Sequence, residues 1–363
     1  MNALVTAPAT STVEVTRFED GIHFGIPEDQ YHRDDALGST ILKELVLDPI
    51  EYQHARLHGG EKKETFALKW GSAIHCRVLE GRLSMAERFP IAPAIKDYIG
   101  ILDTVEDLKR HCRTIGITPG KVKAETIARI READSEVQIW DEIIAKFEAD
   151  NVGKTIIPRD ALHHIERAAQ WMQRDRELSP VMEDGTFTAG ASEVSIFYTE
   201  NGIRLKARLD HLLAHGVIDL KSFRAIMAER LIPAAKRAVS RMRYDLQAAA
   251  YIRALRAAAK LFAAGKVFNN PYKPEFLDTV FATLAADKMK WIWVLIKASG
   301  APQSVVAEFN TNSMIFKTAG MEIDDAIKNY RELTAKFGPD QDWVPDNASE
   351  VWGDEDFAPW AFQ

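Results

Sequence analysis

The chain has 363 residues, of which 46% are hydrophobic and 27% charged, so its composition is that of a folded globular protein and excludes collagen-like or largely disordered chains. Its length allows two or three domains, or one large domain with insertions. The net charge of -7 at pH 7 argues against a uniformly cationic surface of the kind that binds nucleic acid.

The N-terminal part lacks the features of a targeting or anchoring segment. Residues 1–20 have neither a basic start nor a continuous apolar stretch, so they predict a disordered arm and not a signal peptide. The longest clear apolar run, residues 291–296, is far shorter than the roughly 20 residues of a membrane-spanning helix. We therefore expect a cytoplasmic protein that does not enter a membrane.

Helices are expected in the first part of the folded region. From about residue 27 to residue 80 the apolar spacing is helical, with Ser39 as a candidate helix cap and Pro49 as an interruption. A second helix contains residues 71–79. Helical spacing returns from residue 135 to about residue 176.

Residues 103–132 predict a compact helical insertion. They contain an acidic helix start, a Gly-Ile-Thr-Pro-Gly turn and a second amphipathic helix. This pattern is similar to a SAP motif, a small DNA-binding element. Seven cations stand against five acids there, a net charge of only +2, so electrostatics give DNA binding little support. The alternative is a helical hairpin that packs on the core.

The periodicity changes from helical to alternating at residue 191. Residues 193–199 predict a strand, Glu200 to Gly202 predict a hairpin turn, and alternation from Ile203 predicts a second strand. The further elements expected are a strand at 217–221, basic helices to about 264, strands at 276–285, 292–297 and 304–309, and a final helix to 337. This order of helices, mixed sheet and helices indicates the α+β class.

A loop at residues 215–216 would decide which residues of the next hairpin pair. If it has two residues, antiparallel pairing places Asp210 opposite Lys221 and Leu212 opposite Asp219. Both carboxylates and the ammonium then lie on one side of the sheet. The apolar residues expected on the opposite side are Leu209, Ile218 and Leu220.

Two carboxylates this close repel each other unless a cation lies between them. The group therefore predicts a divalent metal with oxygen ligands, Mg²⁺ in the first place and Mn²⁺ in the second. Such a metal activates water for phosphodiester hydrolysis, and Lys221 can orient that water or stabilise developing charge. The alternative is an ordinary surface ion pair between Asp210 and Lys221, with Asp219 at a strand end.

Other candidate site residues come from separate elements. His75 follows small residues that allow a helix to approach a sheet edge, although a lone histidine is often a satisfied core or surface residue. Gln247 and Tyr251 are spaced i, i+4 on one helix face. Glu193 adds a carboxylate ahead of the first strand, where a solvated strand end is the alternative.

The cations are concentrated in one part of the sequence. Between Arg204 and Arg256, twelve Lys and Arg residues stand against four acids, a net charge of +8. A DNA-binding surface and a pair of solvated, Arg-rich helices explain this equally well. The DNA-binding candidates are Arg208, Arg224, Arg237, Arg241 and Arg243.

The order of these motifs resembles the PD-(D/E)xK nuclease superfamily, and within it the RecE-like phage and prophage exonucleases, which are related to the RecB nuclease domain and to lambda exonuclease. The resemblance covers about residues 22–363. It implies a restriction-endonuclease-like core in which a central mixed β-sheet is flanked by helices, with an N-terminal helical region. Residues 21–363 would be one nuclease domain that includes the insertion 103–132 and an acidic, aromatic C-terminal segment, 338–363.

The resemblance also implies roles for individual residues. The implied metal ligands are His75, Asp210, Asp219 and the backbone carbonyl of Leu220. Lys221 would assist the attacking water, and Gln247 and Tyr251 would line the substrate site. The role of Glu193 stays open. Only two cysteines occur, Cys76 and Cys112, which excludes the related branch that holds an iron-sulfur cluster with four.

Enzymes of this branch degrade one strand of duplex DNA ends 5′ to 3′, leaving a 3′ single strand for an annealing recombinase, commonly as rings. We therefore expect a metal-dependent exodeoxyribonuclease of a bacterial or phage-infected cell, forming a ring-shaped homo-oligomer and acting with a RecT-like recombinase. The alternatives are an endonuclease of the same fold and a non-catalytic protein that binds DNA ends.

The C-terminal segment has an unusual composition. From residue 340 it contains seven acids, no Lys or Arg, and several aromatic residues. One interpretation is a tail that docks on a basic partner or covers a neighbouring subunit. The other is a terminal segment whose tryptophans pack on the protein itself.

Overall fold

A seven-stranded mixed sheet forms the centre of the computed structural model, which describes residues 17–60, 65–226, 229–344, 353 and 356. The strand order is β7-β1-β4-β5-β6-β8-β9, and the β1–β7 and β6–β8 pairs are parallel. The strands are β1 (Gly21–His23), β4 (Ala191–Glu200), β5 (Ile203–Leu213), β6 (Gly216–Phe223), β7 (Val267–Phe268), β8 (Lys290–Lys297) and β9 (Ser304–Asn310). A separate hairpin joins β2 (Met182–Glu183) to β3 (Thr186–Phe187).

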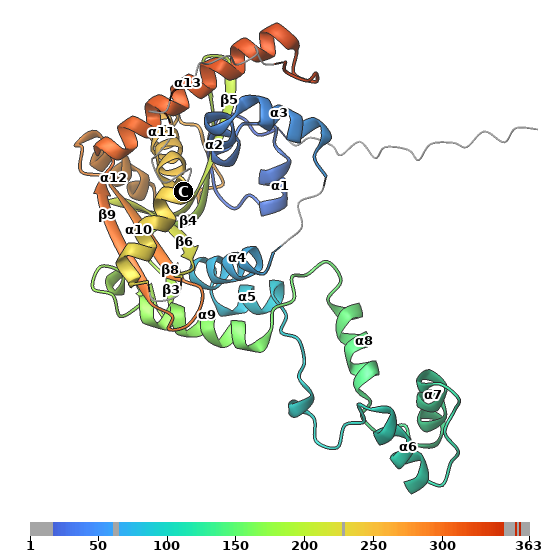
Figure 1. Ribbon diagram of the computed structural model, residues 1–363. Helices are drawn as coiled ribbons and strands as arrows, with labels where there is room; N and C mark the ends of the chain where they lie inside the picture. Colours follow the sequence, from blue (N-terminus) through green and yellow to red (C-terminus); the bar gives the residue numbers. More distant parts are fainter. Residues whose placement is uncertain (1–16, 61–64, 227–228, 345–352, 354–355, 357–363) are drawn as a thin grey trace, which may run out of the picture.

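Helices cover both faces of this sheet (Figure 1). The first face packs against α2 (Ser39–Leu47), α10 (Leu231–Arg241), α11 (Tyr244–Ala263), α12 (Pro274–Ala285) and α13 (Met314–Phe337). The second face packs against α4 (Phe66–Leu79), α5 (Arg82–Arg88) and α9 (Arg159–Met172). Two further helices are α1 (Glu28–Arg33) and α3 (Pro49–His58). The expected mixed sheet flanked by helices is confirmed.

The β4–β5 hairpin forms where the sequence predicts it. Glu200 pairs with Ile203, so Asn201 and Gly202 make a two-residue loop. Both have positive φ, 50° and 79°, the backbone shape that matches the twist of a tight hairpin and that Asn and Gly adopt most readily.

The next hairpin has a different register from the predicted one. Leu213 pairs with Gly216 and Leu212 with Val217, so the two-residue loop is 214–215 and not 215–216. Because of this shift, the β6 residue opposite each β5 residue differs by two positions from the predicted one. Side chains alternate between the two faces of a strand with a period of two, so a shift of two positions does not by itself change which face a side chain occupies. The expectation that Leu209 lies on the same face as Ile218 and Leu220 is wrong. Leu209 packs with Val217 on the first face, whereas Ile218 and Leu220 pack on the second.

Two predictions of local structure are also wrong: a strand in the second half of the chain and a helix cap near its N-terminal end. Residues 276–285, predicted as a strand, belong to α12, where Pro274 starts the helix and Leu277 and Val280 are buried one turn apart. A short apolar run does not by itself distinguish a strand from a buried helix. Ser39 does not cap its helix through its side chain, because Gly38 takes the N-cap position.

The insertion extends away from the sheet (Figure 1). The expected pair of helices within 103–132 is present as α6 (Val105–Thr114) and α7 (Lys123–Ala133), and α8 (Trp140–Asp150) follows it. Its own small core consists of Leu108, Cys112, Ile130 and Ile139. Thr104 and Asp107 form a reciprocal capping box that fixes the start of α6.

The chain ends are described in part. The disordered arm was predicted to extend to residue 20, but Phe18 already stacks on Phe197 of β4. Residues 1–16 of the predicted arm lie outside the described residues. In the C-terminal segment, Trp343 is buried and packs on Tyr52 and Tyr330, as the second interpretation requires, whereas its later tryptophans lie outside the described residues. None of the described helices is long and apolar enough to cross a membrane.

Candidate active site

Two central strands separate at the position of the predicted acids. β5 and β6 pair only from His211 with Ile218 to Leu213 with Gly216, after which β6 continues along β8. Asp210 is the first β5 residue beyond this ladder, and its Oδ2 accepts a hydrogen bond of 2.8 Å from the backbone N–H of Leu220. We call residues 210 and 219–221 the β5–β6 fork.

Asp219 and Lys221 form a buried ion pair on β6. Lys221 Nζ donates to Asp219 Oδ1 at 2.6 Å, and the Asp219 residue is only 1% exposed. The other oxygen, Oδ2, is buried and has no hydrogen-bond partner among the described residues. The indole N–H of the neighbouring Trp293 makes no hydrogen bond of ordinary geometry with it. A buried carboxylate oxygen without a donor has the free lone pairs that a metal ligand needs.

The charges of the fork are coupled. Burial raises the pKa of Asp219 to about 7, an effect that Lys221 opposes and Asp210 strengthens. For Lys221, burial lowers the pKa, but the charges of Asp219 and Asp210 outweigh it and the net shift is upward. Lys221 therefore remains an ammonium at neutral pH.

His75 reaches the fork from α4. Small residues on this helix allow the approach: a Cβ built on Gly71 would lie 3.6 Å from Ser222 Oγ of β6, and Ala73 is fully buried. His75 Nε2 lies 2.9 Å from the Leu220 carbonyl oxygen. Because a carbonyl only accepts, Nε2 carries the proton and donates.

The other nitrogen of His75 faces a carboxylate. Nδ1 lies 3.8 Å from Asp210 Oδ2. Burial lowers the pKa of His75, so the ring is neutral at neutral pH and Nδ1 presents a lone pair toward Asp210. Two acceptor atoms facing each other offer lone pairs to a divalent cation. Asp219 does not join them in a preformed cluster, because the ligand atoms of His75, Asp210 and Asp219 do not all lie within 4.8 Å of one another in the described structure. The Leu220 carbonyl oxygen, by contrast, already accepts from His75 and from Lys221 Nζ at 3.2 Å.

Gln247 and Tyr251 belong to α11, which packs on the first face of the sheet, and lie on that side of the fork. Gln247 Nε2 donates to Tyr251 Oη at 3.2 Å. Burial raises the pKa of Tyr251 to about 12, with the nearby charges of Asp210 and Asp219 adding to the rise and Lys221 opposing it. The phenol is therefore a donor throughout the physiological range, and it also contacts Ser39 at the start of α2.

Glu193 lies at the same level as Asp210. The β4–β5 ladder pairs Ser192 with His211 and Val194 with Leu209 and skips the residues between them, and Glu193 has a φ of 56°. Positive φ in a non-glycine strand residue is strained and common at functional sites. Burial raises the pKa of Glu193 to about 7; Arg208 opposes the rise and Asp210 adds to it. Glu193 thus belongs to the electrostatic surroundings of the fork.

Sequence reasoning did not find every residue at this site. Tyr244, the first residue of α11, places its ring 5.4 Å from Lys221 Nζ. Trp293 is the β8 partner of Asp219 in the parallel register. Both come from elements distant in the sequence, and only the pairing of β6 with β8 and the packing of α11 bring them to the fork.

The five arginines predicted to contact DNA are not equivalent. Arg208 is buried beneath Tyr31 and donates to Ser195, Glu193 and the Ile26 carbonyl, so it is not available to a phosphate. Two are held by carboxylates: Arg237 by Glu229, and Arg243 by Asp245 and Glu322. Arg224 and Arg241 are exposed. Lys236 and Arg241 are exposed cations on α10, and Arg230 is exposed at its N-cap.

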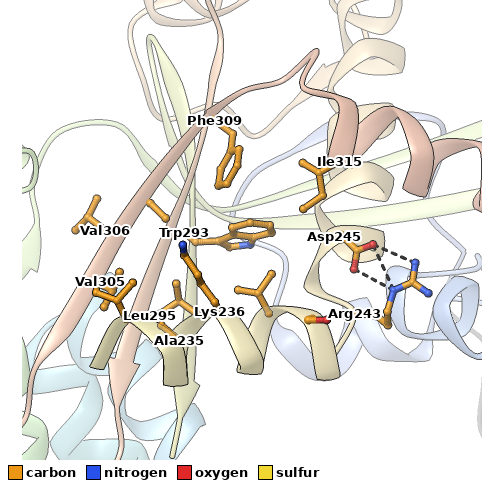
Figure 2. A pocket seen from close by; sticks show the side chains of 14 residues that line it. Ala235, Lys236, Arg243, Asp245, Trp293, Leu295, Val305, Val306, Phe309 and Ile315 are labelled. Atoms are coloured by element: carbon orange, nitrogen blue, oxygen red, sulfur yellow. Dashed lines mark hydrogen bonds and ion pairs between the residues drawn. The ribbon is translucent and has the colours of Figure 1, made fainter. Parts of the chain in front are cut away.

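A hollow of about 550 Å³ opens beside the fork on the first face of the sheet, between α10 and β9 (Figure 2). Its lining includes Trp293, Phe309 and Lys236, together with the Arg243–Asp245 ion pair. Because Trp293 pairs in register with Asp219, this hollow is one strand away from the fork. The acids of the fork do not line it.

Metal affinity should depend on pH through Asp219. Because a metal binds the ionised carboxylate, and the pKa of Asp219 is about 7, the affinity for Mg²⁺ rises by about tenfold per pH unit below 7 and levels off above it. Calorimetric titration between pH 5.5 and 8.5 measures this. Glu193→Gln, which removes the other carboxyl with a pKa of about 7, should keep the dependence, and a flat profile in the wild type would contradict it.

Arg77 fixes the helix that carries His75. It is fully buried and donates to Glu166 of α9 at 2.8 Å, to Thr186 at 2.8 Å and to the Asp184 carbonyl at 2.7 Å. Arg77→Ala leaves Glu166 without its buried partner, so urea unfolding should show a loss of about 3 kcal/mol. The control is Arg82→Ala, which removes an exposed partner of the same carboxylate and should cost about 1 kcal/mol or less.

A family model described as "PDDEXK-like domain of unknown function (DUF3799)" matches residues 38–268, a range that includes the whole fork, His75 and the Gln247–Tyr251 pair. Among solved structures, the crystal structure of a "Putative exonuclease" from Eubacterium rectale aligns at 13% identity and a TM-score of 0.41, covering 85% of this chain and 88% of that one. None of the curated proteins matches the sequence.

Proposed function

The chain belongs to the family of PDDEXK-like domains, and on that premise we propose that it is a metal-dependent exodeoxyribonuclease that hydrolyses the phosphodiester bonds of linear double-stranded DNA. PDDEXK nucleases generally use divalent metal ions, and we propose Mg²⁺ for this chain, with Mn²⁺ as a substitute. The observation that carries the proposal is the β5–β6 fork, where Asp210, Asp219 and Lys221 converge and Asp219 Oδ2 has no partner among the described residues.

The residues that would hold the metal are Asp210, Asp219 and His75. A bound Mg²⁺ would supply the positive charge that polarises a phosphodiester and acidifies water. The oxygen-rich donor set suits this hard cation. The Leu220 carbonyl becomes a further ligand only if His75 and Lys221 give up their hydrogen bonds to it.

The chain's own residues complete the chemistry. Because its pKa is raised, Lys221 holds its proton, so it orients water and stabilises the negative charge that develops on the phosphate, and it does not act as a base. Tyr251 likewise keeps its proton and is oriented by Gln247. We propose that the exposed cations at and on α10 attract the DNA backbone, and their exposure supports this.

The finer features of the proposal come from the order of the sequence motifs. Because these motifs resemble those of RecE-like enzymes, we propose that the protein degrades DNA with 5′ to 3′ polarity and leaves a 3′ single strand for a RecT-like recombinase. On the same basis we propose that it assembles into a ring. We also propose that the SAP-like pair α6–α7 contacts DNA. This pair lies on an arm that extends away from the sheet (Figure 1), which leaves space for a duplex beside it.

Digestion of linear duplexes labelled at either the 5′ or the 3′ terminus tests this function. With Mg²⁺ we expect the 5′ label to be released first, as mononucleotides, and a chelator to stop the release. Covalently closed circular DNA should remain intact. Cutting of the circle would identify an endonuclease, and binding of ends without release under any divalent metal would identify a non-catalytic end-binding protein.

A further inference from the structure

The segment that follows α13 returns to α3 and is held there on both sides of Asp342. Gln53 Nε2 donates to the carbonyls of Pro339 at 2.8 Å and Gln341 at 2.6 Å. On the other side, the Trp343 ring is buried between α3 and α13, and its indole N–H donates to the Gly338 carbonyl at 3.0 Å. The backbone at Asp342 is therefore fixed against α3.

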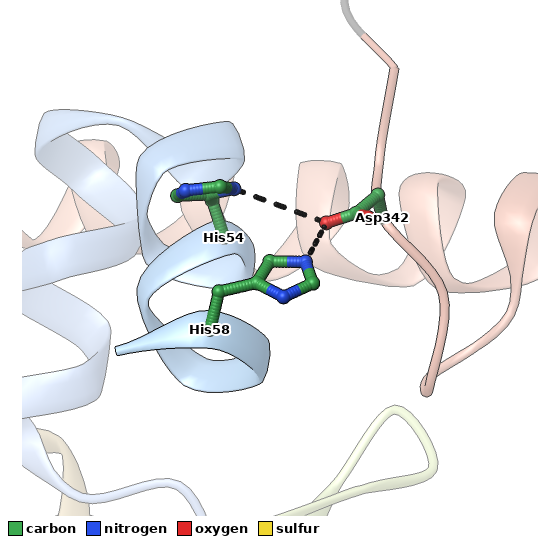
Figure 3. A group of neighbouring side chains, drawn as sticks. All are labelled: His54, His58 and Asp342. Atoms are coloured by element: carbon green, nitrogen blue, oxygen red, sulfur yellow. Dashed lines mark hydrogen bonds and ion pairs between the residues drawn. The ribbon is translucent and has the colours of Figure 1, made fainter. Parts of the chain in front are cut away.

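Two histidines of α3 point toward this carboxylate (Figure 3). His54 and His58 are four residues apart and lie on one face of the helix, with ring centroids 4.8 Å apart. His58 Nε2 lies 2.8 Å and His54 Nδ1 4.0 Å from Asp342 Oδ1. The three ligand atoms all lie within 4.8 Å of one another.

We propose that His54, His58 and Asp342 bind a Zn²⁺ ion that fastens the segment after α13 to α3. Two imidazole nitrogens and one carboxylate oxygen are donors that zinc prefers, and three protein ligands leave a fourth position for water. All three side chains are half exposed or more, so an ion can enter and the rings can rotate without loss of core packing. This site is separate from the fork, whose donors are mainly oxygen and suit a harder cation.

The local charge favours a cation at this position. One oxygen, Asp342 Oδ1, faces both imidazole rings. A neutral imidazole can donate a hydrogen bond through only one of its two nitrogens, so its other nitrogen keeps a lone pair. A zinc ion would instead use the lone pairs of all three groups. The neighbouring Asp340 pairs with Arg56, whereas Asp342 makes no ion pair with a Lys or Arg among the described residues, so its charge is available to a metal.

Calorimetric titration of the full chain with Zn²⁺, in excess Mg²⁺, tests the site. We expect His54→Gln and His58→Gln each to bind one Zn²⁺ fewer than the wild type. The fork also offers ligands to zinc, so the count is read as a difference between variants. The matched control is His32→Gln, which removes an exposed histidine of α1 that has its own carboxylate neighbour four residues away, and it should bind as the wild type does. Equal stoichiometry in all four proteins, or a loss in the control as well, would overturn the proposal.

Hydrogen exchange of residues 339–344 supplies a second readout that reports on the fastening itself. Zn²⁺ should slow exchange there in the wild type and leave it unchanged in His58→Gln, with circular dichroism establishing that the variant is folded. Protection factors remove the intrinsic slowing of exchange in acid. If they rose at low pH in the presence of a chelator and did not respond to Zn²⁺, imidazolium–carboxylate pairs would hold the segment, and the zinc site would be refuted.

Discussion

Asp219→Asn is expected to lower the rate of the proposed metal-dependent DNA degradation by at least about a hundredfold. It removes the buried charge that would hold the metal and that pairs with Lys221, while keeping the shape of the side chain. The measurement is kcat for release of nucleotides from a linear duplex at pH 8. At that pH the wild-type carboxyl, whose pKa is about 7, is mainly ionised.

The matched control for this variant is Glu308→Gln. Glu308 of β9 also accepts from a lysine, Lys290, at 2.6 Å, but this pair lies on the surface of the sheet edge. Its loss should leave kcat within about twofold of the wild type, because exposed ion pairs contribute little. If Asp219→Asn and Glu308→Gln had the same rate, the fork would not be the active site.

Lys221→Met has the largest expected effect on stability. It leaves Asp219, which is 1% exposed, without the ammonium that compensates its charge, and removal of one partner from a buried pair typically costs about 3 kcal/mol or more. Urea unfolding of the metal-free protein at pH 8 measures the loss. DNA degradation should also stop, because no other described cation pairs with Asp219.

The double variant Asp219→Asn/Lys221→Met separates the two effects. It removes both buried charges, so most of the stability lost in Lys221→Met should return while degradation remains absent. Lys290→Met, at the exposed pair, should cost less than about 1 kcal/mol. A double variant as unstable as the single one would mean that Lys221 stabilises the fold through its packing and not through its charge.

The fold could be predicted where the sequence pattern is strong. Alternation across residues 203–210, the turn at 200–202 and the helical spacing of residues 71–79 all led to the observed elements. The prediction failed where several interpretations share one pattern, as in α12, and where elements are too short to carry a period. β1 and β7 have three and two residues, and their positions are set by pairing with each other and with β4.

The candidate site could be predicted in its residues more than in its geometry. The predicted hairpin register was wrong by one loop position, but that error moved each partner by an even number of residues. Asp219 and Lys221 still form an ion pair, and Asp210 lies near enough to affect the pKa of both. The separation of β5 from β6, which gives Asp210 its place beside the Leu220 N–H, leaves no mark in the sequence. The raised pKa of Glu193 likewise depends on burial that only the assembled fold produces.

The basic segment shows why charge counts along a sequence are weak evidence for a binding surface. Arg204 pairs with Asp34, Arg243 with Glu322 and Arg253 with Glu200, and each of these acids lies at least 50 residues away in the chain or in another element. Tertiary pairing thus neutralises much of the local excess of +8. Within this segment, the exposed cations Arg224, Arg230, Lys236 and Arg241 are candidates for phosphate contacts.

The most direct test of the account is the position of a metal ion in a crystal of this protein soaked in Mn²⁺, located by anomalous diffraction at the manganese edge. We expect a peak at the β5–β6 fork, in contact with the carboxylates of Asp210 and Asp219 and close to the His75 ring. A fully loaded crystal in which the fork has no peak and manganese lies only elsewhere would contradict the account.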